Sequence, residues 1–437
     1  MIRLFEQFGY KEEHKCTGLD PTDQRLLEKE LQNRKIGSYV KTVIRKGEPC
    51  CCYKIDYNGS DDYRLMTSYF VGVDWVIENQ LALHVCPKEN ENDIEIDYIN
   101  MLLRALAEPE NLSHLDGLCT IEFGKPYIPV SQKQDLLSPF LIAQYISVLK
   151  HIVHKGLKKS YYTKTENLKG KVKGKILISQ NIKRNIAKGK STDAVCSYQE
   201  FGYDTVENRL LKKALVFSRH ALGTFSGLDA SPLGHALDYI SPAFKNISDE
   251  ISINDIKHLS RHPIYKEYEE AVKLAKTILE RYSYNITNTE RTLVKTPPFW
   301  IDMSKLFELY VYKKLREIFP APNEVVYHKT FRKKEIDFLI NSPDKNIKMV
   351  ADAKYKPRYH DRSVELQDIR QISAYARMEN VYKEFQIDDD RLIDCLIIYS
   401  NQECEEDISV SALNAAENKL CSYRNFYKTG IRLPKIE

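Results

Sequence analysis

The strongest constraint on the fold of this chain is a pair of short apolar runs that both contain acidic residues. Residues 335–340 read EIDFLI and residues 349–354 read MVADAK, and a turn with Pro343 and Asp344 separates them. Apolar runs of this length on either side of a turn predict two adjacent strands. An edge pair with ordinary surface charge is the alternative. The apolar residues beside the charges favour a buried sheet with a site at its end.

Three charged side chains are expected to meet where these strands pair. Side chains alternate along a strand, so Asp352 and Lys354 project from one face, and strand pairing brings Asp337 beside them. Two neighbouring carboxylates are costly without a cation, and their oxygens favour Mg²⁺, with Mn²⁺ as an alternative. Such an ion polarises a phosphate and lowers the pKa of its bound water, while the lysine ammonium orients that water. The pattern therefore predicts hydrolysis of a phosphodiester.

The surrounding segments predict an α/β domain over residues 296–437. Pro297 and Pro298 break the chain, and Asp302 or Ser304 can cap the helix that follows. The order of periodic segments is then αβββαβ, which is typical of an α/β sandwich. The expected segments are a helix that ends near residue 318, strands 324–327, 335–340 and 348–351, a helix over 366–378 and a strand over 392–399.

Two further domains are expected upstream, because 437 residues suit two or three domains. Residues 1–130 form a β-rich N-terminal module, in which Ile77–Gln80 joins strands 69–76 and 81–87 as a hairpin. Residues 131–295 form a mainly helical middle domain, with helices over 137–153 and from Asp204 or Thr205 to Leu222. The whole chain is therefore expected to be a multi-domain α/β protein. We expect the N-terminal module to dock a partner, because it has no catalytic grouping.

The middle domain contains the most basic part of the chain. Residues 155–190 hold twelve Lys or Arg and one acid, Glu166, although the net charge of the whole chain is only +4. A solvated loop is one interpretation. Contact with nucleic-acid phosphates is the interpretation we favour, because aromatic and aliphatic residues interleave with the charge. The lysines expected to bind DNA here are Lys169, Lys171, Lys173 and Lys175.

Composition excludes several other classes of protein. The ten cysteines lack the paired spacing of a zinc site, and the first 15 residues lack the apolar run of a signal peptide. No stretch approaches the roughly 18 apolar residues of a membrane span, so we expect a cytoplasmic protein and no membrane contact. Gly189-Lys190-Ser191-Thr192 looks like the end of a P-loop, but Arg184 stands where that motif needs glycine. We therefore expect no nucleotide site in this chain.

The order Asp337, then Asp352-Ala353-Lys354, resembles the PD-(D/E)XK nuclease motif, although Ile336 stands where many members have proline. The segment ADAKYK, residues 351–356, resembles in particular the McrC subunit of McrBC-type and LlaJI-type restriction systems. The resemblance extends to residues 81–88, 170–176 and 203–211, and so covers most of the chain. It implies a restriction endonuclease subunit that cleaves double-stranded DNA with an McrB-like AAA+ GTPase hexamer. The partner would bind GTP and recognise the target.

Three more residues complete the expected site. Gln371 and Tyr375 lie four residues apart on one helix face, which resembles the QxxxY helix of RecB-like nucleases. Glu308 matches the position where such nucleases supply an additional acid to the metal, so the expected metal ligands are Asp337, Asp352 and Glu308. A half-buried helix face and a solvated glutamate are the structural alternatives. Just past Lys354, residues Lys356, Arg358, His360 and Arg362 are expected to hold the DNA backbone.

Two other functions compete with a restriction nuclease. The first is an adaptor that activates the GTPase partner and cuts nothing, but an adaptor has no use for three such charges in one place. The second is a RecB-like repair nuclease, which shares Gln371 and Tyr375 but does not account for the upstream segments. The sequence leaves open which DNA is cut and whether methylation is required.

Overall fold

The computed structural model divides the chain into two compact units. It describes residues 1–6, 21–34, 37–45, 47–57, 63–87, 89–90, 94–131, 137–223, 231–251, 266–287, 293–331, 334–356, 359, 364–405 and 407–435. The first unit lies within Met1–Phe140, Gly227–Pro232 and Thr292–Glu437. The second unit lies within Leu141–Ser226 and Leu233–Arg291. None of the described helices combines the length and apolar character that crossing a lipid bilayer requires.

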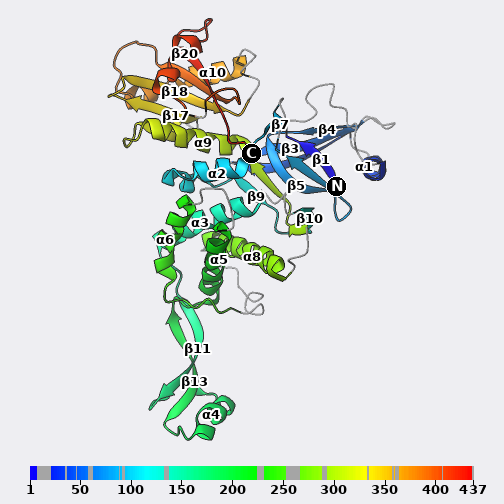
Figure 1. Cartoon of the computed structure of the whole chain (residues 1–437), viewed down its shortest axis with the longest axis vertical. Coiled ribbons are helices and arrows are strands. Elements are labelled where there is room, and N and C mark those ends of the chain that lie inside the picture. Colours follow the sequence, from blue (N-terminus) through cyan, green and yellow to red (C-terminus); the bar gives the residue numbers. More distant parts are fainter. Residues whose placement is uncertain are drawn as a thin grey trace. The chain divides into compact units, whose positions relative to one another are not determined.

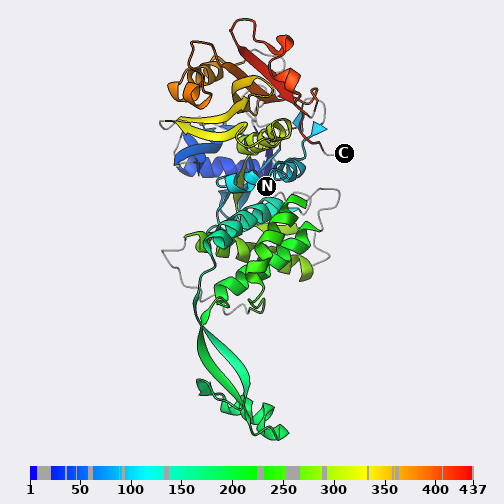
Figure 2. The same ribbon diagram turned by 90° about the vertical axis from the view of Figure 1, so that its left-hand side faces the viewer.

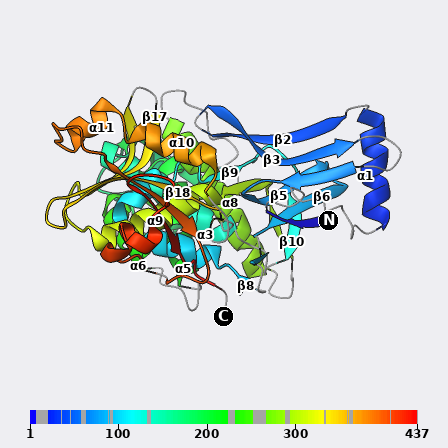
Figure 3. The ribbon, with the colours of Figure 1, turned by 90° about the horizontal axis from the view of Figure 1, so that it is seen from above.

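The N-terminal part of the first unit contains two sheets around one core. A five-stranded sheet has the order β1-β6-β5-β15-β9, and a separate antiparallel sheet has the order β2-β3-β4. The helix α1 (Pro21–Arg34) lies across the ends of these strands (Figure 3). Apolar residues from both sheets, including Tyr53 and Trp300, form the buried cluster between them. The strands are β1 (Ile2–Phe5), β2 (Ser38–Arg45), β3 (Glu48–Tyr57), β4 (Tyr63–Thr67), β5 (Phe70–Ile77), β6 (Leu81–Cys86), β9 (Cys119–Ile121) and β15 (Phe299–Asp302).

The hairpin expected at Ile77–Gln80 is confirmed, since β5 and β6 pair on either side of it. Asn79 takes a left-handed φ of 59° there, which asparagine tolerates better than most residues. Shorter elements complete this region: the pairs β7 (Glu89–Asn90) with β8 (Ile94–Glu95) and β10 (Ile128–Ser131) with β14 (Leu293–Thr296), the helix α2 (Tyr98–Ala105) and the 3₁₀ helix η1 (Pro109–His114).

Strand β15 belongs to the N-terminal sheet, although residues 296–437 were expected to form a separate domain. Trp300 pairs with Gly72 of β5 and with Thr120 of β9. A side chain at Gly72 would place its Cβ 2.0 Å from the carbonyl oxygen of Phe299, so glycine is required for the two strands to approach. The chain thus returns to the N-terminal sheet before it enters the C-terminal one.

The C-terminal sheet has the order β16-β17-β18-β19-β20. Its first three strands are antiparallel, and β18, β19 and β20 are parallel. The three strands expected between residues 324 and 351 are present but longer, and β18 runs through the whole of the charged segment. Their bounds are β16 (Val325–Phe331), β17 (Lys334–Ser342) and β18 (Ile347–Lys354), followed by β19 (Asp394–Ser400) and the unexpected β20 (Phe426–Ile431).

Helices cover both faces of this sheet. The helix α9 (Met303–Ile318) begins where expected, because the Asp302 carboxylate accepts a hydrogen bond from the backbone N–H of Lys305. Figure 1 shows α9 beside β17 and β18, and the Tyr312 ring of α9 stacks on Phe338 of β17. On the other face, α10 (Leu366–Tyr375) contributes Ile369 and Ile372 to the core. The remaining helices are α11 (Glu379–Glu384), α12 (Val410–Leu413) and the 3₁₀ helix η6 (Ala416–Asn418).

The second unit contains a group of helices and a long hairpin. Its helices are α3 (Leu137–Lys155), α5 (Val206–Leu222), α6 (Ser231–Ile240), α8 (Lys266–Thr287) and the 3₁₀ helix η4 (Ser241–Phe244). Thr205 caps α5 as expected, by accepting a hydrogen bond from the backbone N–H of Asn208. Asn208 is fully buried and donates to the carbonyl oxygens of Lys158 and Tyr203. Asn208 therefore joins the base of the hairpin to the helices.

The basic segment is a strand hairpin and not a loop. Strand β11 (Ser160–Lys169) pairs over its whole length with β13 (Asp193–Gly202), and the two-residue β12 (Lys175–Ile176) pairs with the other edge of β13. Figures 1 and 2 show this hairpin extending from the helices of the second unit, with α4 (Ile178–Arg184) at its far end. The 3₁₀ helix η3 (Ile186–Lys188) follows α4.

Candidate metal centre

The three charges expected to meet do so at the paired ends of β17 and β18. The Lys354 Nζ atom lies 2.7 Å from Asp352 Oδ2, as the shared face of one strand predicts. The Asp337 carboxylate accepts a hydrogen bond of 3.0 Å from the backbone N–H of Ala353, between those two residues. Asp352 is almost completely buried, with 2% of its surface exposed. Strand pairing therefore places both carboxylates and the ammonium in one small site.

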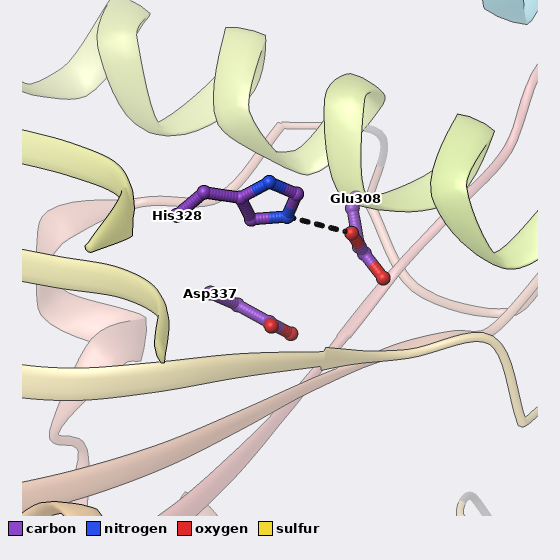
Figure 4. Close-up of side chains that lie close together, drawn as sticks. All are labelled: Glu308, His328 and Asp337. Atoms are coloured by element: carbon purple, nitrogen blue, oxygen red, sulfur yellow. Dashed lines mark hydrogen bonds and ion pairs between the residues drawn. The ribbon is translucent and has the colours of Figure 1, made fainter. Parts of the chain in front are cut away.

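Two side chains from other elements join Asp337. Glu308 of α9 and His328 of β16 offer ligand atoms that lie within 4.8 Å of each other and of an Asp337 oxygen (Figure 4). The His328 Nε2 atom is 3.1 Å from Glu308 Oε2, and Tyr327 donates its hydroxyl to the same oxygen at 3.3 Å. The expectation that Glu308 belongs to the site is thus consistent with its position. His328 is a residue that the sequence analysis did not single out.

The electrostatics of the site favour a bound cation. Burial raises the pKa of Asp337 well above its usual range, and the charges of Asp352 and Glu308 raise it further. Burial also raises the pKa of Asp352, although the ammonium of Lys354 opposes this. Burial lowers the pKa of Lys354, but the charges of Asp352 and Asp337 outweigh that effect and raise it above its ordinary value. Burial and mutual repulsion therefore disfavour the charged forms of the two acids, and a bound cation would relieve that cost.

The residues present fit a divalent ion of the kind that oxygen ligands hold. Asp352 Oδ2 lies 2.7 Å from the Lys354 ammonium, whereas Asp352 Oδ1 accepts no hydrogen bond from the described residues. A buried carboxylate oxygen without a donor is unusual, because desolvation of such a group is costly. A metal ion beside Asp337 and Asp352 would satisfy this oxygen.

The helix α10 contacts the site as expected from the spacing of Gln371 and Tyr375. Lys354 donates a hydrogen bond of 3.4 Å to Gln371 Oε1, and Gln371 Nε2 donates one of 3.2 Å to the Tyr375 hydroxyl. Asp368 of the same helix lies 3.9 Å from Lys354 Nζ. Gln371 thus contacts the lysine directly, while Tyr375 reaches it only through Gln371.

An arginine of the N-terminal module contacts the acids of the site. Arg45, at the end of β2, lies 3.0 Å from the Asp302 carboxylate and 3.6 Å from the Glu308 carboxylate. Burial raises the pKa of Asp302 to about 6, and the nearby guanidinium opposes that rise. Arg45 therefore connects the cap of α9 with a candidate metal ligand on the same helix.

Tyr355, the residue after Lys354, is anchored to Glu6, which directly follows β1. The Tyr355 hydroxyl donates a hydrogen bond of 2.7 Å to Glu6 Oε1, and the Tyr98 hydroxyl donates one of 3.1 Å to the same oxygen. All three side chains are buried. The backbone around Lys354 is thus held by groups from β18, from α2 and from the segment that follows β1.

The structure describes only part of the DNA-contacting set that was expected past Lys354. Lys356 forms ion pairs of 2.7 Å with both Glu365 and Asp368, so its charge is already matched. Arg358, His360 and Arg362 lie outside the described residues. A role for any of these in DNA binding stays a prediction.

The lysines of the basic segment gather at the end of the hairpin in the second unit. Lys169, Lys171, Lys173 and Lys175 are all exposed. The Lys173 ammonium lies over the Tyr198 ring at 3.9 Å, and Gly174 has a left-handed φ of 68° in the turn beside it. Exposed large apolar side chains occur in the same region, at Val172, Ile176, Ile178, Ile182 and Ile186. This end of the hairpin therefore presents both cationic and apolar groups to a partner.

Two site residues were not predicted from the sequence. His328 lies one residue beyond the strand expected to end at Tyr327, and only a longer strand would have placed it opposite Asp337. Arg45 is separated from Glu308 by more than 250 residues and has no local motif. The alternation along β16 was a usable signal for the first, whereas nothing in the sequence indicates the second.

Comparison with known proteins gives a family for this chain. The family model described as McrBC 5-methylcytosine restriction system component matches residues 67–393, about three quarters of the chain. No curated protein is detectably similar to it. A solved half-complex from a tetradecameric assembly of Thermococcus gammatolerans McrB AAA+ hexamers with bound McrC matches 99% of this chain and 94% of the other, at 15% identity and a TM-score of 0.38. The cryo-EM structure of the Thermococcus gammatolerans McrBC complex matches 74% of this chain and 89% of the other, at 16% identity and a TM-score of 0.27.

Those two TM-scores are too low to support a structural argument, so the assignment depends on the family model. Its match begins at the end of β4 and continues through the second unit to the residue before β19, and it includes Glu308, Asp337, Asp352 and Lys354. This chain therefore belongs to the McrBC 5-methylcytosine restriction system component family.

Proposed function

We propose that this chain is the DNA-cleaving subunit of an McrBC-like restriction complex, with a PD-(D/E)XK site and Mg²⁺ as its cofactor. The observation that supports this most is the meeting of Asp337, Asp352 and Lys354 at the ends of two paired strands. These three residues lie in a domain whose elements follow the order αβββαβ, with α9 before the three strands and α10 after them. Family membership adds that the chain is a component of a restriction system.

Each residue has a distinct task in this proposal. Asp337 and Asp352 hold the ion through their carboxylate oxygens, and Glu308 adds a third acid on the α9 side. A bound divalent ion supplies Lewis-acid polarisation of the scissile phosphate and lowers the pKa of its water. Lys354, whose pKa the neighbouring carboxylates raise, serves as a cation and hydrogen-bond donor toward the attacking water and the phosphoryl oxygens. Gln371 limits the directions in which Lys354 can point.

We further propose an AAA+ GTPase hexamer, similar to McrB, as the partner. A family described as a component of a restriction system implies other components. The Thermococcus gammatolerans assembly contains McrB AAA+ hexamers with bound McrC. The partner would supply GTP hydrolysis and target recognition, and double-stranded DNA is the substrate. Cleavage of both strands requires two active sites, because one site hydrolyses one phosphodiester.

The test is cleavage of plasmid DNA by the reconstituted complex with GTP and Mg²⁺, run beside a GTPase measurement. Asp352→Ala should abolish cleavage and leave GTP hydrolysis near the wild-type rate. Lys354→Ala should abolish cleavage while metal binding is largely retained. Asp389→Asn is a matched control, since Asp389 is an exposed acid of the same region that pairs only with Arg391 among the described residues.

The same assay separates the two rival functions. Wild-type cleavage by Asp352→Ala would refute the active-site assignment and favour an adaptor that only activates the GTPase. Cleavage that needs a free DNA end, and neither GTP nor the partner, would favour a RecB-like repair nuclease instead.

A further inference from the structure

We propose that His328 supplies a nitrogen ligand to the metal centre beside Glu308 and Asp337, and that the site consequently binds Mn²⁺ more tightly than Mg²⁺. This inference rests on the proposed metal-dependent function and names the ion that the site prefers. The three groups come from a helix and two strands, and their ligand atoms all lie within 4.8 Å of one another (Figure 4).

The first support is the way both ring nitrogens of His328 face carboxylates. Nε2 lies 3.1 Å from Glu308 Oε2, and Nδ1 lies 3.0 Å from Glu335 Oε1. A neutral imidazole has one N–H, so it can donate to only one of these two acids. If Nδ1–H donates to Glu335, a lone pair on Nε2 faces the Glu308 oxygen. A cation between them removes the repulsion between those lone pairs.

The spacing agrees with a shared ion. Neighbouring ligand atoms around an octahedral cation with bonds of about 2.1 Å stand about 3 Å apart. The distance of 3.1 Å between His328 Nε2 and Glu308 Oε2 matches that value. Glu335 then acts as the carboxylate that orients a metal-bound histidine from behind, an arrangement common in metal sites.

The backbone supports the same assignment. His328 has a left-handed φ of 52° within β16, which is uncommon for a residue other than glycine. The register around it is regular, because Tyr327 pairs with Phe338 and Lys329 pairs with Ile336, so His328 lies opposite Asp337. Sparsely populated backbone conformations persist where the surrounding structure enforces them, and they are enriched at functional sites. In this conformation the His328 ring lies toward Glu308 and stacks on the Tyr327 ring, with 3.7 Å between the two ring centroids.

We assign a third carboxylate to the same centre. Asp352 is buried and lies next to Asp337 in the paired strands, and its Oδ1 atom accepts no hydrogen bond from the described residues. The complete donor set is then three carboxylates and one imidazole. Mg²⁺ is held by oxygen ligands and water. Mn²⁺ also suits carboxylates, but as a first-row transition ion it accepts an imidazole nitrogen more readily than Mg²⁺ does. The nitrogen donor therefore increases the preference for Mn²⁺ over Mg²⁺ relative to a site made of three acids alone.

The experiment uses the full chain after removal of metal with a chelator. Mn²⁺ is added, and pulsed electron paramagnetic resonance detects whether a nitrogen nucleus is coupled directly to the bound ion. The wild type should show this coupling, and Mg²⁺ should displace Mn²⁺ only at a large excess. His328→Asn should remove the coupling and weaken Mn²⁺ binding about 10–100-fold, the range seen when a metal site loses a supporting group, with a much smaller change for Mg²⁺.

Asparagine is chosen because it tolerates a left-handed backbone, so the variant removes the imidazole without forcing β16 to change. His220→Asn, an exposed histidine of the second unit, is the matched control and should leave both the coupling and the affinities unchanged. Absence of nitrogen coupling in the wild type overturns the inference. Equal weakening of Mn²⁺ and Mg²⁺ by His328→Asn, with a lowered melting temperature, also overturns it, since the histidine would then have a purely structural role.

The outcome is distinguishable from failure of the proposed function. A chain that binds Mn²⁺ through nitrogen but cuts no DNA with its partner refutes the nuclease and leaves the metal assignment intact. A chain that cuts DNA but shows no nitrogen coupling refutes the role of His328 and leaves the nuclease intact.

Discussion

The carboxylate of Asp337 accepts a hydrogen bond of 3.0 Å from the backbone N–H of Ala353, the residue that separates Asp352 from Lys354. The contact crosses from β17 to β18 beyond the last regular pair of that ladder, Phe338 with Ala351. It fixes where Asp337 stands relative to the other two charges. One side chain therefore has both a structural task and a proposed metal-binding task, and substitutions can separate them.

We expect Asp337→Asn and Asp337→Ala to abolish cleavage equally, because both remove a negative ligand. Their stabilities should differ, since asparagine keeps an oxygen for the Ala353 N–H and alanine leaves that buried donor unsatisfied. The cost of an unsatisfied donor is about 1–3 kcal/mol. Chemical denaturation of both variants measures the difference. Equal unfolding free energies would show that the hydrogen bond contributes no stability.

The stability of the chain should depend on pH through Asp302. Its pKa is raised from 3.8 to about 6 in the folded chain, so the folded state holds this proton more tightly than the unfolded state. The resulting stabilisation is complete below pH 4 and is lost as pH rises through 6. The loss amounts to at most about 3 kcal/mol, from about 1.4 kcal/mol per pKa unit.

Asp302→Asn tests this, because asparagine also caps a helix but does not titrate. Relative to the wild type, the variant should gain stability between pH 4 and pH 7, measured by denaturant unfolding at each pH. Parallel stability curves for the two proteins would contradict the prediction.

Gln371 should position Lys354 without binding metal. We expect Gln371→Leu to lower kcat and leave Mg²⁺ affinity unchanged, because the 3.4 Å contact to Lys354 is lost and no metal-facing acid is touched. Gln371→Glu retains an acceptor for the ammonium and should restore much of the rate. Tyr375→Phe should have a smaller effect, since Tyr375 contacts only the far side of Gln371. A tighter or weaker Mg²⁺ affinity in Gln371→Leu would reject the positioning role.

The lysines at the end of the β11–β13 hairpin are expected to contact phosphates. Replacing Lys169, Lys171, Lys173 and Lys175 with glutamine should weaken DNA binding by the complex and flatten its dependence on salt. The slope of log affinity against log salt falls by about 0.9 for each phosphate contact removed. Replacing the same four with arginine preserves the charge and is the control. An unaltered slope in the glutamine variant would assign these lysines to another task, such as solvation or partner binding.

Substitutions can test which of two exposed apolar surfaces, one on β2 and one on α4, docks the partner. The N-terminal module presents Val40 and Ile44 on β2, and the hairpin presents Ile178 and Ile182 on α4. Since we expect the N-terminal module to dock the partner, serine at Val40 and Ile44 should reduce assembly measured by sedimentation. Serine at Ile178 and Ile182 is the comparison. If only the hairpin variant loses assembly, the N-terminal docking prediction is wrong.

Local patterns in the sequence predicted much of the fold. The cap at Asp302, the turn at Ile77–Gln80 and the adjacency of Asp337, Asp352 and Lys354 are all present. Each depends on residues close in sequence or on the alternation along a single strand. Three strands of the C-terminal sheet, β16, β17 and β18, were predicted too short, because the sequence gives no marker for where pairing with a neighbour ends.

Features that depend on distant pairing could not be predicted. Strand β15 was not predicted, because its partners, β5 and β9, lie far upstream and the segment was interpreted as a break before a separate domain. The contact of Arg45 with Glu308 likewise joins segments with no sequence relationship. The β11–β13 hairpin was missed for another reason: its many lysines resemble a solvated loop, although the burial pattern along β11 alternates as in a strand.

The hydrogen bond between Glu6 and Tyr355 has a consequence for biosynthesis. The two residues are 349 positions apart, so the contact that supports the segment after Lys354 forms only after the ribosome has made at least the first 355 of the 437 residues. A fragment that lacks the first six residues leaves the Tyr355 hydroxyl without the Glu6 carboxylate, one residue beyond Lys354. We therefore expect the C-terminal region to lose part of its support when it is separated from the start of the chain.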